Sequence, residues 1–300
     1  MDSVVRYPLK FQVGARTLFA IDRPLIRIAY TLDGAGAAET PKLPQLGKAA
    51  GYVVTSIPES LIDGLRIGGL LVHVRQRYMR YFADFSAGFD AYMSHFSSKS
   101  RATLKRKLKR YADLSGGALD VRSYRTADEM PGFVDAASLV SRKSYQHRLL
   151  DAGLPDDDAA RADMAKLAEA DQVRAFLLFR DGRATAYLYM PVTEDTLIYA
   201  YLGYDPEEAE RSPGTVLQVE AIRILAEEGR YGRLDFTEGE GQHKRLFSTG
   251  GIACADVLLL RPTMGNRLLI GALQGFDGAV AWLKQLSGAQ GFGWLKALRR

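Results

Sequence analysis

The sequence predicts an α/β protein in which a mixed, mostly antiparallel sheet is flanked by helices. Residues 172–204 contain three apolar segments rich in β-branched and aromatic residues, QVRAFLLF, ATAYLYM and LIYAYLGY, separated by the polar turns RDGR and TEDT. This alternation is typical of an antiparallel meander. Residues 213–228 follow with the pattern of a helix, with Pro213 in the first turn and Gly229 after the last.

The composition indicates a chain with a real hydrophobic core and a modest positive charge. Apolar residues make up 47% of the sequence and aromatic residues 10%, which argues against disorder. The net charge of +5 favours anionic partners such as phosphorylated ligands, nucleic acid or lipid headgroups. Cys254 is the only cysteine, so no internal disulfide can form. Because the N-terminus lacks a signal pattern and no apolar run approaches the roughly twenty residues that span a bilayer, we expect a cytoplasmic protein without a transmembrane segment.

Residues 1–115 are expected to form a smaller N-terminal lobe that ends in a basic helix. Residues 1 to about 90 favour strands and loops. Residues 97–111 then place apolar side chains at helical spacing and carry many cations. These are Lys99, Arg101, Lys105, Arg106, Lys107, Lys109 and Arg110. The sequence SGG at 115–117 favours a joint, so residues 116–300 are expected to form a second lobe, closed by amphipathic helices within 266–300.

The second lobe is expected to run strand, two helices, three antiparallel strands, helix, strand, short helix, strand. Thr126 is placed to cap the first helix, which would run toward Tyr145. The acids at 156–158 suit the start of the second helix. LIYAYLGY at 197–204 is expected to be one continuous strand, and RLDF at 233–236 the strand after the 213–228 helix.

Two polar segments of this lobe are candidates for a functional site. DFTEGEGQHKRLF, residues 235–247, begins at the carboxyl end of a buried strand, where α/β folds commonly place chemistry. SPGT, residues 212–215, opens a helix whose first backbone N–H groups suit a phosphate, the alternative being ordinary capping by Ser212. Together the two segments predict a phosphorylated cofactor beside a reactive group.

From residue 118 the order of elements resembles the GNAT acyltransferase fold. In that family the third meander strand and the strand after the helix splay apart. Acyl-CoA enters the gap, and its pyrophosphate rests on the N-terminus of the intervening helix. The resemblance implies that LIYAYLGY and RLDF are the splayed strands and that SPGT receives the phosphates. The N-terminal lobe is then a candidate for a degenerate GNAT half, which would make the chain a tandem GNAT.

Short motifs narrow the resemblance to the CelD/BcsL group of GNAT proteins, which is associated with cellulose biosynthesis and resembles the FemAB aminoacyltransferases. The group typically shows a Gly-Tyr-Asp run, a Ser-Pro-Gly helix start and Asp-Phe-x-x-Gly-Asp-x-x-Tyr-Lys. The matching residues are Gly203, Tyr204, Asp205, Ser212, Pro213, Gly214, Asp235, Phe236, Gly239 and Lys244. Glu240 stands in the acidic place and His243 in that of the tyrosine. The resemblance covers about residues 80–260. The usual GNAT pyrophosphate loop, Arg or Gln followed by spaced glycines, is absent, which leaves the donor open.

Four residues are candidates for catalysis. His243 has an ordinary pKa near 6.5 and can relay a proton at neutral pH, and Glu238 is a second candidate base. Asp235 is a base or, in the interpretation we favour, an orienting or structural group at a strand end. Tyr204, at the end of its strand, can protonate a leaving thiolate. The competing interpretations are a surface histidine and solvated turn acids.

The resemblance implies further residues for the donor and the acceptor. Those expected to bind the cofactor are Leu202, Gly203, Ser212, Pro213, Gly214 and Thr215. Those expected to bind the acceptor are Arg142, Tyr145, Gln146, Tyr201 and Lys244, the first three because SRKSYQHR at 141–148 falls where the fold places its acceptor-facing segment. Tyr199 is more simply explained by core packing. No cluster of histidine, cysteine or carboxylate residues has metal-ligand spacing, so no metal is expected.

The function favoured by the sequence is transfer of an acyl group from a thioester, expected to be acyl-CoA, to an amine on a sugar or small metabolite. Acyl carrier protein and aminoacyl-tRNA stay open as donors because the pyrophosphate loop is missing. A non-catalytic GNAT-like scaffold in polysaccharide production is a further alternative. The basic helix 97–111 is a candidate contact for tRNA, a carrier protein or a membrane surface, the alternative being a solvated face.

Overall fold

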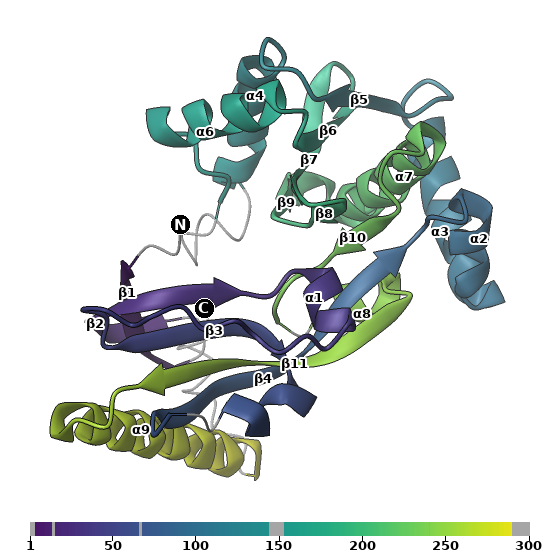
Figure 1. Cartoon of the computed structure of the whole chain (residues 1–300). Helices are drawn as coiled ribbons and strands as arrows, with labels where there is room; N and C mark the ends of the chain where they lie inside the picture. Colours follow the sequence, from purple (N-terminus) through teal and green to yellow (C-terminus); the bar gives the residue numbers. More distant parts are fainter. Residues whose placement is uncertain (1–3, 14–15, 66–67, 144–152, 240, 290–300) are drawn as a thin grey trace. The chain divides into compact units, whose positions relative to one another are not determined.

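The computed structural model describes residues 4–13, 16–65, 68–143, 153–239 and 241–289. The strands are β1 (Val4–Val13), β2 (Arg16–Ala29), β3 (Gly51–Pro58), β4 (Leu71–Asp84), β5 (Asp120–Tyr124), β6 (Val173–Arg180), β7 (Arg183–Thr193), β8 (Thr196–Ile198), β9 (Tyr201–Tyr204), β10 (Arg233–Asp235) and β11 (Gly250–Leu260). The α-helices are α1 (Leu32–Gly36), α2 (Phe89–His95), α3 (Ser98–Asp113), α4 (Met130–Lys143), α6 (Asp158–Glu169), α7 (Pro213–Glu228), α8 (Gln242–Phe247) and α9 (Met264–Ala289), and the 3₁₀ turns are η1 (Glu59–Leu61), η2 (Asp63–Leu65) and η3 (Pro206–Arg211). This mostly antiparallel sheet flanked by helices confirms the predicted fold class (Figure 1).

The chain divides into two compact units, unit 1 with residues 1–79 and 252–300 and unit 2 with residues 80–251. In unit 1 the strand order is β1-β2-β3-β11-β4, with β2 and β3 parallel and β3 and β11 antiparallel. Leu269 and Leu273 of α9 pack with Leu9 and Leu25 in one apolar cluster. Cys254 is buried in β11, as its apolar surroundings predict.

Unit 2 is a three-layer structure in which helices cover both faces of a sheet. Its strand order is β4-β10-β8-β7-β6-β5, and β9 also pairs with β7. Phe176 and Leu178 of β6 face the cluster formed with α2, α3 and α7, whereas Ala175 and Leu177 face the cluster formed with α4 and α6. Burial on both faces explains why β6 reads as a continuous apolar run.

The predicted third meander strand is broken in two. LIYAYLGY forms β8 and β9, separated by Tyr199 and Ala200, so the prediction of one continuous strand is wrong. β10 runs parallel to β8, and the Tyr199 N–H still donates to the Asp235 carbonyl at 2.9 Å. Beyond this point the described strands show no pairing between β9 and β10. The predicted divergence of the two segments is therefore present, and the break at residues 199–200 produces it.

The helix expected to be capped by Thr126 begins later, at Met130. The Glu129 carboxylate accepts the backbone N–H groups of Arg125 and Thr126 at 2.8 and 2.9 Å, which holds the preceding residues in a turn. The predicted end of this helix, toward Tyr145, lies outside the described residues. Among the described helices, none combines the length and apolar character needed to cross a membrane.

The boundaries of the two compact units differ from those of the expected lobes, residues 1–115 and 116–300. The basic helix α3 belongs to unit 2 because its Leu104 and Tyr111 are buried against that unit's core. The C-terminal helix α9 belongs to unit 1. A tandem arrangement of two GNAT halves stays a prediction.

Candidate functional site

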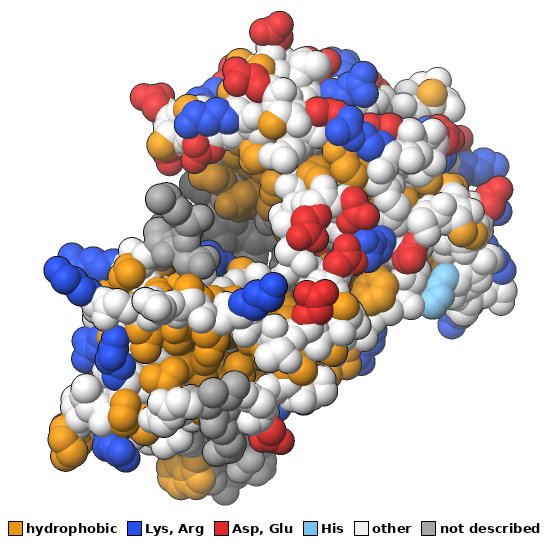
Figure 2. All heavy atoms as spheres, in the orientation of Figure 1, with side chains coloured by type: hydrophobic (Ala, Val, Ile, Leu, Met, Phe, Trp, Pro, Cys, Tyr) orange, Lys and Arg blue, Asp and Glu red, His pale blue; other side chains and the backbone are white. Residues whose placement is uncertain are grey.

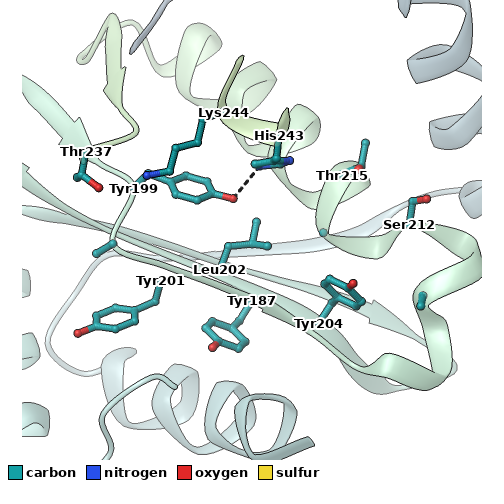
Figure 3. A pocket seen from close by; sticks show the side chains of 13 residues that line it. Tyr187, Tyr199, Tyr201, Leu202, Tyr204, Ser212, Thr215, Thr237, His243 and Lys244 are labelled. Carbon is teal, nitrogen blue, oxygen red and sulfur yellow. Dashed lines mark hydrogen bonds between the residues drawn. The ribbon is translucent and has the colours of Figure 1, made fainter. Parts of the chain in front are cut away.

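A pocket of about 580 Å³ opens in unit 2 where β9 leaves β10. Its walls come from the break between β8 and β9, from β9, from the start of α7 and from α8 (Figure 3). The lining residues are Tyr187, Tyr199, Ala200, Tyr201, Leu202, Tyr204, Ala209, Ser212, Gly214, Thr215, Thr237, His243 and Lys244. In Figure 3, Ser212, Thr215 and Tyr204 lie toward one end, and Tyr199, His243 and Lys244 gather away from it.

The first end is the N-terminus of α7. Ser212 has left-handed backbone angles (φ 56°, ψ 48°), and its hydroxyl makes no capping hydrogen bond, so ordinary capping does not explain this serine. A side chain at Gly214 would place its Cβ 3.1 Å from Leu202 Cδ2 and 3.3 Å from Tyr204 Cδ1, so glycine keeps this part of the pocket open. Helix N–H groups without intrahelical acceptors and two nearby hydroxyls suit a phosphate.

The second end contains a short hydrogen-bonded chain. The Tyr199 hydroxyl lies 3.0 Å from His243 Nε2 and donates to Gln218 Oε1 at 3.3 Å. Burial, reinforced by the positive charges of Lys244 and Lys107, lowers the pKa of His243 to about 4. Burial also raises the pKa of Tyr199. At neutral pH the imidazole is therefore uncharged and able to accept a proton, and the phenol keeps the proton that it can donate.

Lys244 supplies a cation beside this chain. Its ammonium group donates to the Glu238 carbonyl, and burial lowers its pKa. The polar turn that holds it includes Thr237 at φ 60° and Gly239 at φ 92°, both in the left-handed region. The glycine of the sequence motif therefore stands where a side chain would strain the backbone.

Asp235 is fully buried and lies behind the pocket rather than on its wall. Its carboxylate accepts Nε of Arg80 at 3.1 Å and Nη2 at 2.5 Å, and also the Thr237 N–H at 2.8 Å. The Arg80 side chain is itself only 7% exposed. An acid held by a buried guanidinium and a backbone N–H orients the turn, which supports the orienting interpretation over that of a base.

The structure brings most of the predicted donor residues together but not all the predicted site residues. Leu202, Tyr204, Ser212, Gly214 and Thr215 line the pocket with Tyr201, His243 and Lys244. Gly203 and Pro213 are buried without lining it. Gly203 makes room for the Tyr187 ring, because a Cβ there would stand 2.4 Å from Cε1.

The remaining candidates lie elsewhere or outside the described residues. Glu238 is exposed and contributes only its carbonyl to Lys244. Arg142 is exposed and pairs with Asp156 at 2.7 Å. Tyr145, Gln146 and Glu240 lie outside the described residues. Within the part of the chain that is described, no group of three or more histidine, cysteine or carboxylate side chains is placed to hold a metal ion.

Sequence reasoning did not identify Tyr199, Gln218 or Thr237 as site residues. The sequence favours core packing for Tyr199, and its ring does pack against the core, but its hydroxyl, at the strand break, contacts His243. Gln218 carried a usable signal, because it lies three and four positions after Thr215 and Gly214 and so on the same face of α7.

The comparisons with known proteins support this description of the fold. Residues 98–245 match the family model of the acetyltransferase (GNAT) domain. The structure is similar to that of FemX, with a TM-score of 0.57, 10% sequence identity, and coverage of 89% of this chain and 91% of FemX. It is also similar to the C-terminal domain of a protein described as a lysylphosphatidylglycerol synthetase from Agrobacterium fabrum, with a TM-score of 0.52, 17% identity, and coverage of 74% and 71%. No curated protein matches the sequence.

The family match spans the elements that form the pocket, from the basic helix α3 to His243 and Lys244 of α8. Apart from the break between β8 and β9, the order of strands and helices is that predicted from the sequence, as is the divergence of β9 from β10. The GNAT domain model therefore matches the part of the chain that forms the pocket, and the fold is GNAT-like.

Proposed function

We propose that the protein transfers an acyl group from a thioester on a phosphopantetheine arm, the arm of acyl-CoA, to the amine of a sugar or small metabolite. The observation that carries the proposal is the pocket at the parting of β9 and β10. A helix N-terminus suited to phosphate stands toward one end of it, and a neutral imidazole, a phenol and an ammonium group stand toward the other. The motifs that resemble the CelD/BcsL group favour an acceptor from polysaccharide production.

In the proposed reaction the amine nitrogen attacks the thioester carbonyl directly. The C–N bond forms, the C–S bond breaks, the amine loses one proton and the leaving thiolate gains one. His243 takes the amine proton, directly or through water, because its lowered pKa keeps the imidazole neutral. Direct attack requires no protein nucleophile, which fits a chain whose single cysteine is buried and does not line this pocket.

We assign protonation of the thiolate to Tyr199 in place of Tyr204. The Tyr199 hydroxyl lies in the hydrogen-bonded chain with His243, whereas Tyr204 lies with Ser212 and Thr215 toward the α7 end (Figure 3). Tyr204 and Leu202 would then contact the arm, and Lys244 would hold an anionic group of the acceptor or polarise the carbonyl.

An aminoacyl group delivered by aminoacyl-tRNA is the second candidate. The motifs around Gly203, Ser212 and Lys244 resemble a group related to the FemAB aminoacyltransferases, and the fold is shared with FemX over most of both chains. The same pocket chemistry would serve this donor, because an ester is attacked by an amine in the same way as a thioester.

The proposal is tested by mass spectrometry after the protein is mixed with acetyl- and octanoyl-phosphopantetheine and a panel of amino sugars and amino acids. An N-acylated product with the parent and at least a hundredfold less with His243→Gln is the expected result. Gly214→Asp should remove the rise in melting temperature caused by phosphopantetheine, since it places a carboxylate against the phosphate. Absence of any product and of any melting shift would overturn thioester transfer, and product formed only from aminoacyl-tRNA would support the second candidate.

A further inference from the structure

The positive charge of this protein is concentrated on one helix. Residues 98–113 (α3) contain seven of the 40 lysines and arginines and one of the 35 acids, a net charge of +6, so the remainder of the chain carries −1. Many arginines elsewhere in unit 2 are paired with acids, as Arg174 is with Glu228 and Arg223 with Glu220. Acidic and basic side chains are likewise interspersed over the unit 2 part of the face in Figure 2.

The cations of α3 lack such partners. In the described part of the chain, none of its seven lysines and arginines lies within ion-pair distance of an acid, whereas Arg180 pairs with Glu208 and Arg233 with Asp195. A helix face that contacts only solvent commonly carries acidic side chains that balance its basic ones. An uncompensated basic face instead attracts an anionic partner.

The helix lies beside the pocket. The positive charge of Lys107 contributes to the lowered pKa of His243, which lines the pocket. One turn further along, the Tyr111 hydroxyl shares a hydrogen bond with Thr185 at 2.7 Å. The charges of Glu208 and Arg211 also act on the pKa of Tyr111. These two residues belong to η3, the turn that leads into α7. The α3 helix therefore packs against η3 and α7, and the start of α7 forms the phosphate-suited end of the pocket.

The negative charge of the turn η3 disfavours binding of the nucleotide of free CoA. It contains Glu207, Glu208 and Glu210 directly before α7. Glu208 is neutralised by Arg180 and Arg211, whereas Glu207 and Glu210 are exposed and have no ion-pair partner among the described residues. CoA carries a diphosphate and a 3′-phosphate, and these anionic groups would be repelled by the two exposed carboxylates. A single phosphodiester at the α7 N-terminus would not add that charge.

We propose that the acyl donor is an acidic acyl carrier protein, whose phosphopantetheine arm enters the pocket while its acidic surface binds α3. This proposal rests on the proposed N-acyl transfer and names the donor for it. Apart from Asp113 at its end, the exposed side chains of α3 are cations and small residues, while Leu104 and Tyr111 point inward. The helix thus offers charge without the exposed aromatic rings on which nucleic acid bases stack, which favours an acidic protein over tRNA.

The test compares two flanks of the same helix. At about 100° per residue, Arg106, Lys107 and Arg110 lie on the flank that includes the pocket contact, and Arg101, Lys105 and Lys109 lie on the other. Reversing either set to Glu changes the net charge equally. The probes are a fatty-acid acyl carrier protein with its arm (holo) and without it (apo), free CoA and bulk tRNA, each titrated against the full chain by fluorescence anisotropy.

We expect the holo carrier protein to bind at least tenfold more tightly than the apo form and than CoA. Reversal of Arg106, Lys107 and Arg110 should weaken holo binding at least tenfold, and reversal of the control set less than threefold. Equal weakening by both sets would overturn docking on the pocket flank. Tighter binding of CoA or tRNA than of the holo carrier protein would overturn the carrier protein as donor.

Transfer from acetyl-phosphopantetheine, which lacks both nucleotide and carrier, separates this inference from the proposed function. If the small thioester supports transfer and the carrier protein adds no affinity, only the donor assignment fails. If no thioester supports transfer, the proposed function fails with it.

Discussion

At the scale of single residues, burial sets the proton chemistry of the site. The His243 ring lies tilted against the rings of Tyr199 and Phe247, with centroids 5.9 and 4.9 Å away, and the charges of two lysines act on it. Both effects disfavour the imidazolium. The sequence suggested a histidine of ordinary pKa, and the structure supplies one that stays neutral through the physiological range.

The first prediction concerns this pKa. An NMR titration of the histidine ring protons should show His243, assigned with His243→Gln, titrating near pH 4, well below the ordinary value of about 6.5. Because the folded value is the lower one, the folded state binds fewer protons. Stability from this group is complete above about pH 6.5 and is lost as the pH falls through 4.

Lys107→Ala and Lys244→Ala should each raise the His243 pKa, because each removes a positive charge that acts on the ring. A parent midpoint near 6.5, unchanged by either substitution, would show that the ring is solvated and that the basic helix does not reach it.

The second prediction separates a structural Asp235 from a catalytic one. Asp235→Ala should cost about 3–5 kcal/mol of unfolding free energy in urea, because the Arg80 guanidinium would be left buried and unpaired. Arg80→Met combined with Asp235→Leu should recover most of that loss. A stable Asp235→Ala protein without activity would instead identify Asp235 as the base.

At the scale of elements, the break between β8 and β9 shapes the pocket, and the glycine of β9 leaves room for a tyrosine ring of β7. β9 pairs only with β7 among the described strands, with Gly203 opposite Tyr187. The Tyr187 ring occupies the space that a side chain at position 203 would need, and its hydroxyl donates to Ser141 Oγ of α4 at 3.2 Å. Gly203 therefore acts on the site through Tyr187.

The third prediction tests this packing. Gly203→Ala should destabilise the protein by about 1–3 kcal/mol and reduce donor binding, since its Cβ would overlap the Tyr187 ring. Tyr187→Leu should relieve the overlap, so that the double variant is more stable than the two separate losses predict in a double-mutant cycle. Strict additivity of the two changes would contradict a direct contact.

At the scale of the whole molecule, the pocket and its supports belong to unit 2 alone. Every residue of the two apolar clusters around β6 and β7 lies between residues 80 and 251, as does every lining residue of the pocket. Unit 1 has its own clusters, formed from both ends of the chain.

The fourth prediction follows from this division. A polypeptide of residues 80–251 should unfold cooperatively on heating, followed by circular dichroism, and should keep the melting shift caused by phosphopantetheine. Its core clusters and pocket are complete within that range, so the missing residues remove no group that contacts the ligand. A polypeptide without a thermal transition would show that unit 2 depends on unit 1 for its fold.

The sequence by itself determined the elements that local patterns specify. The basic helix, the meander turns and the helix that starts at Pro213 were predictable because apolar period, glycine and proline act within a few residues. The motifs with His243, Lys244 and the 212–215 segment also identified much of the pocket wall, because their residues cluster in two short stretches.

Only the tertiary structure decided what those residues do. The Tyr199–His243 contact, the Arg80–Asp235 pair and the effect of the Lys107 charge on His243 join positions that are between 44 and 155 residues apart. No local pattern encodes such contacts, because they form when separate elements pack. The lowered pKa of His243 and the burial of Asp235 are consequences of that packing.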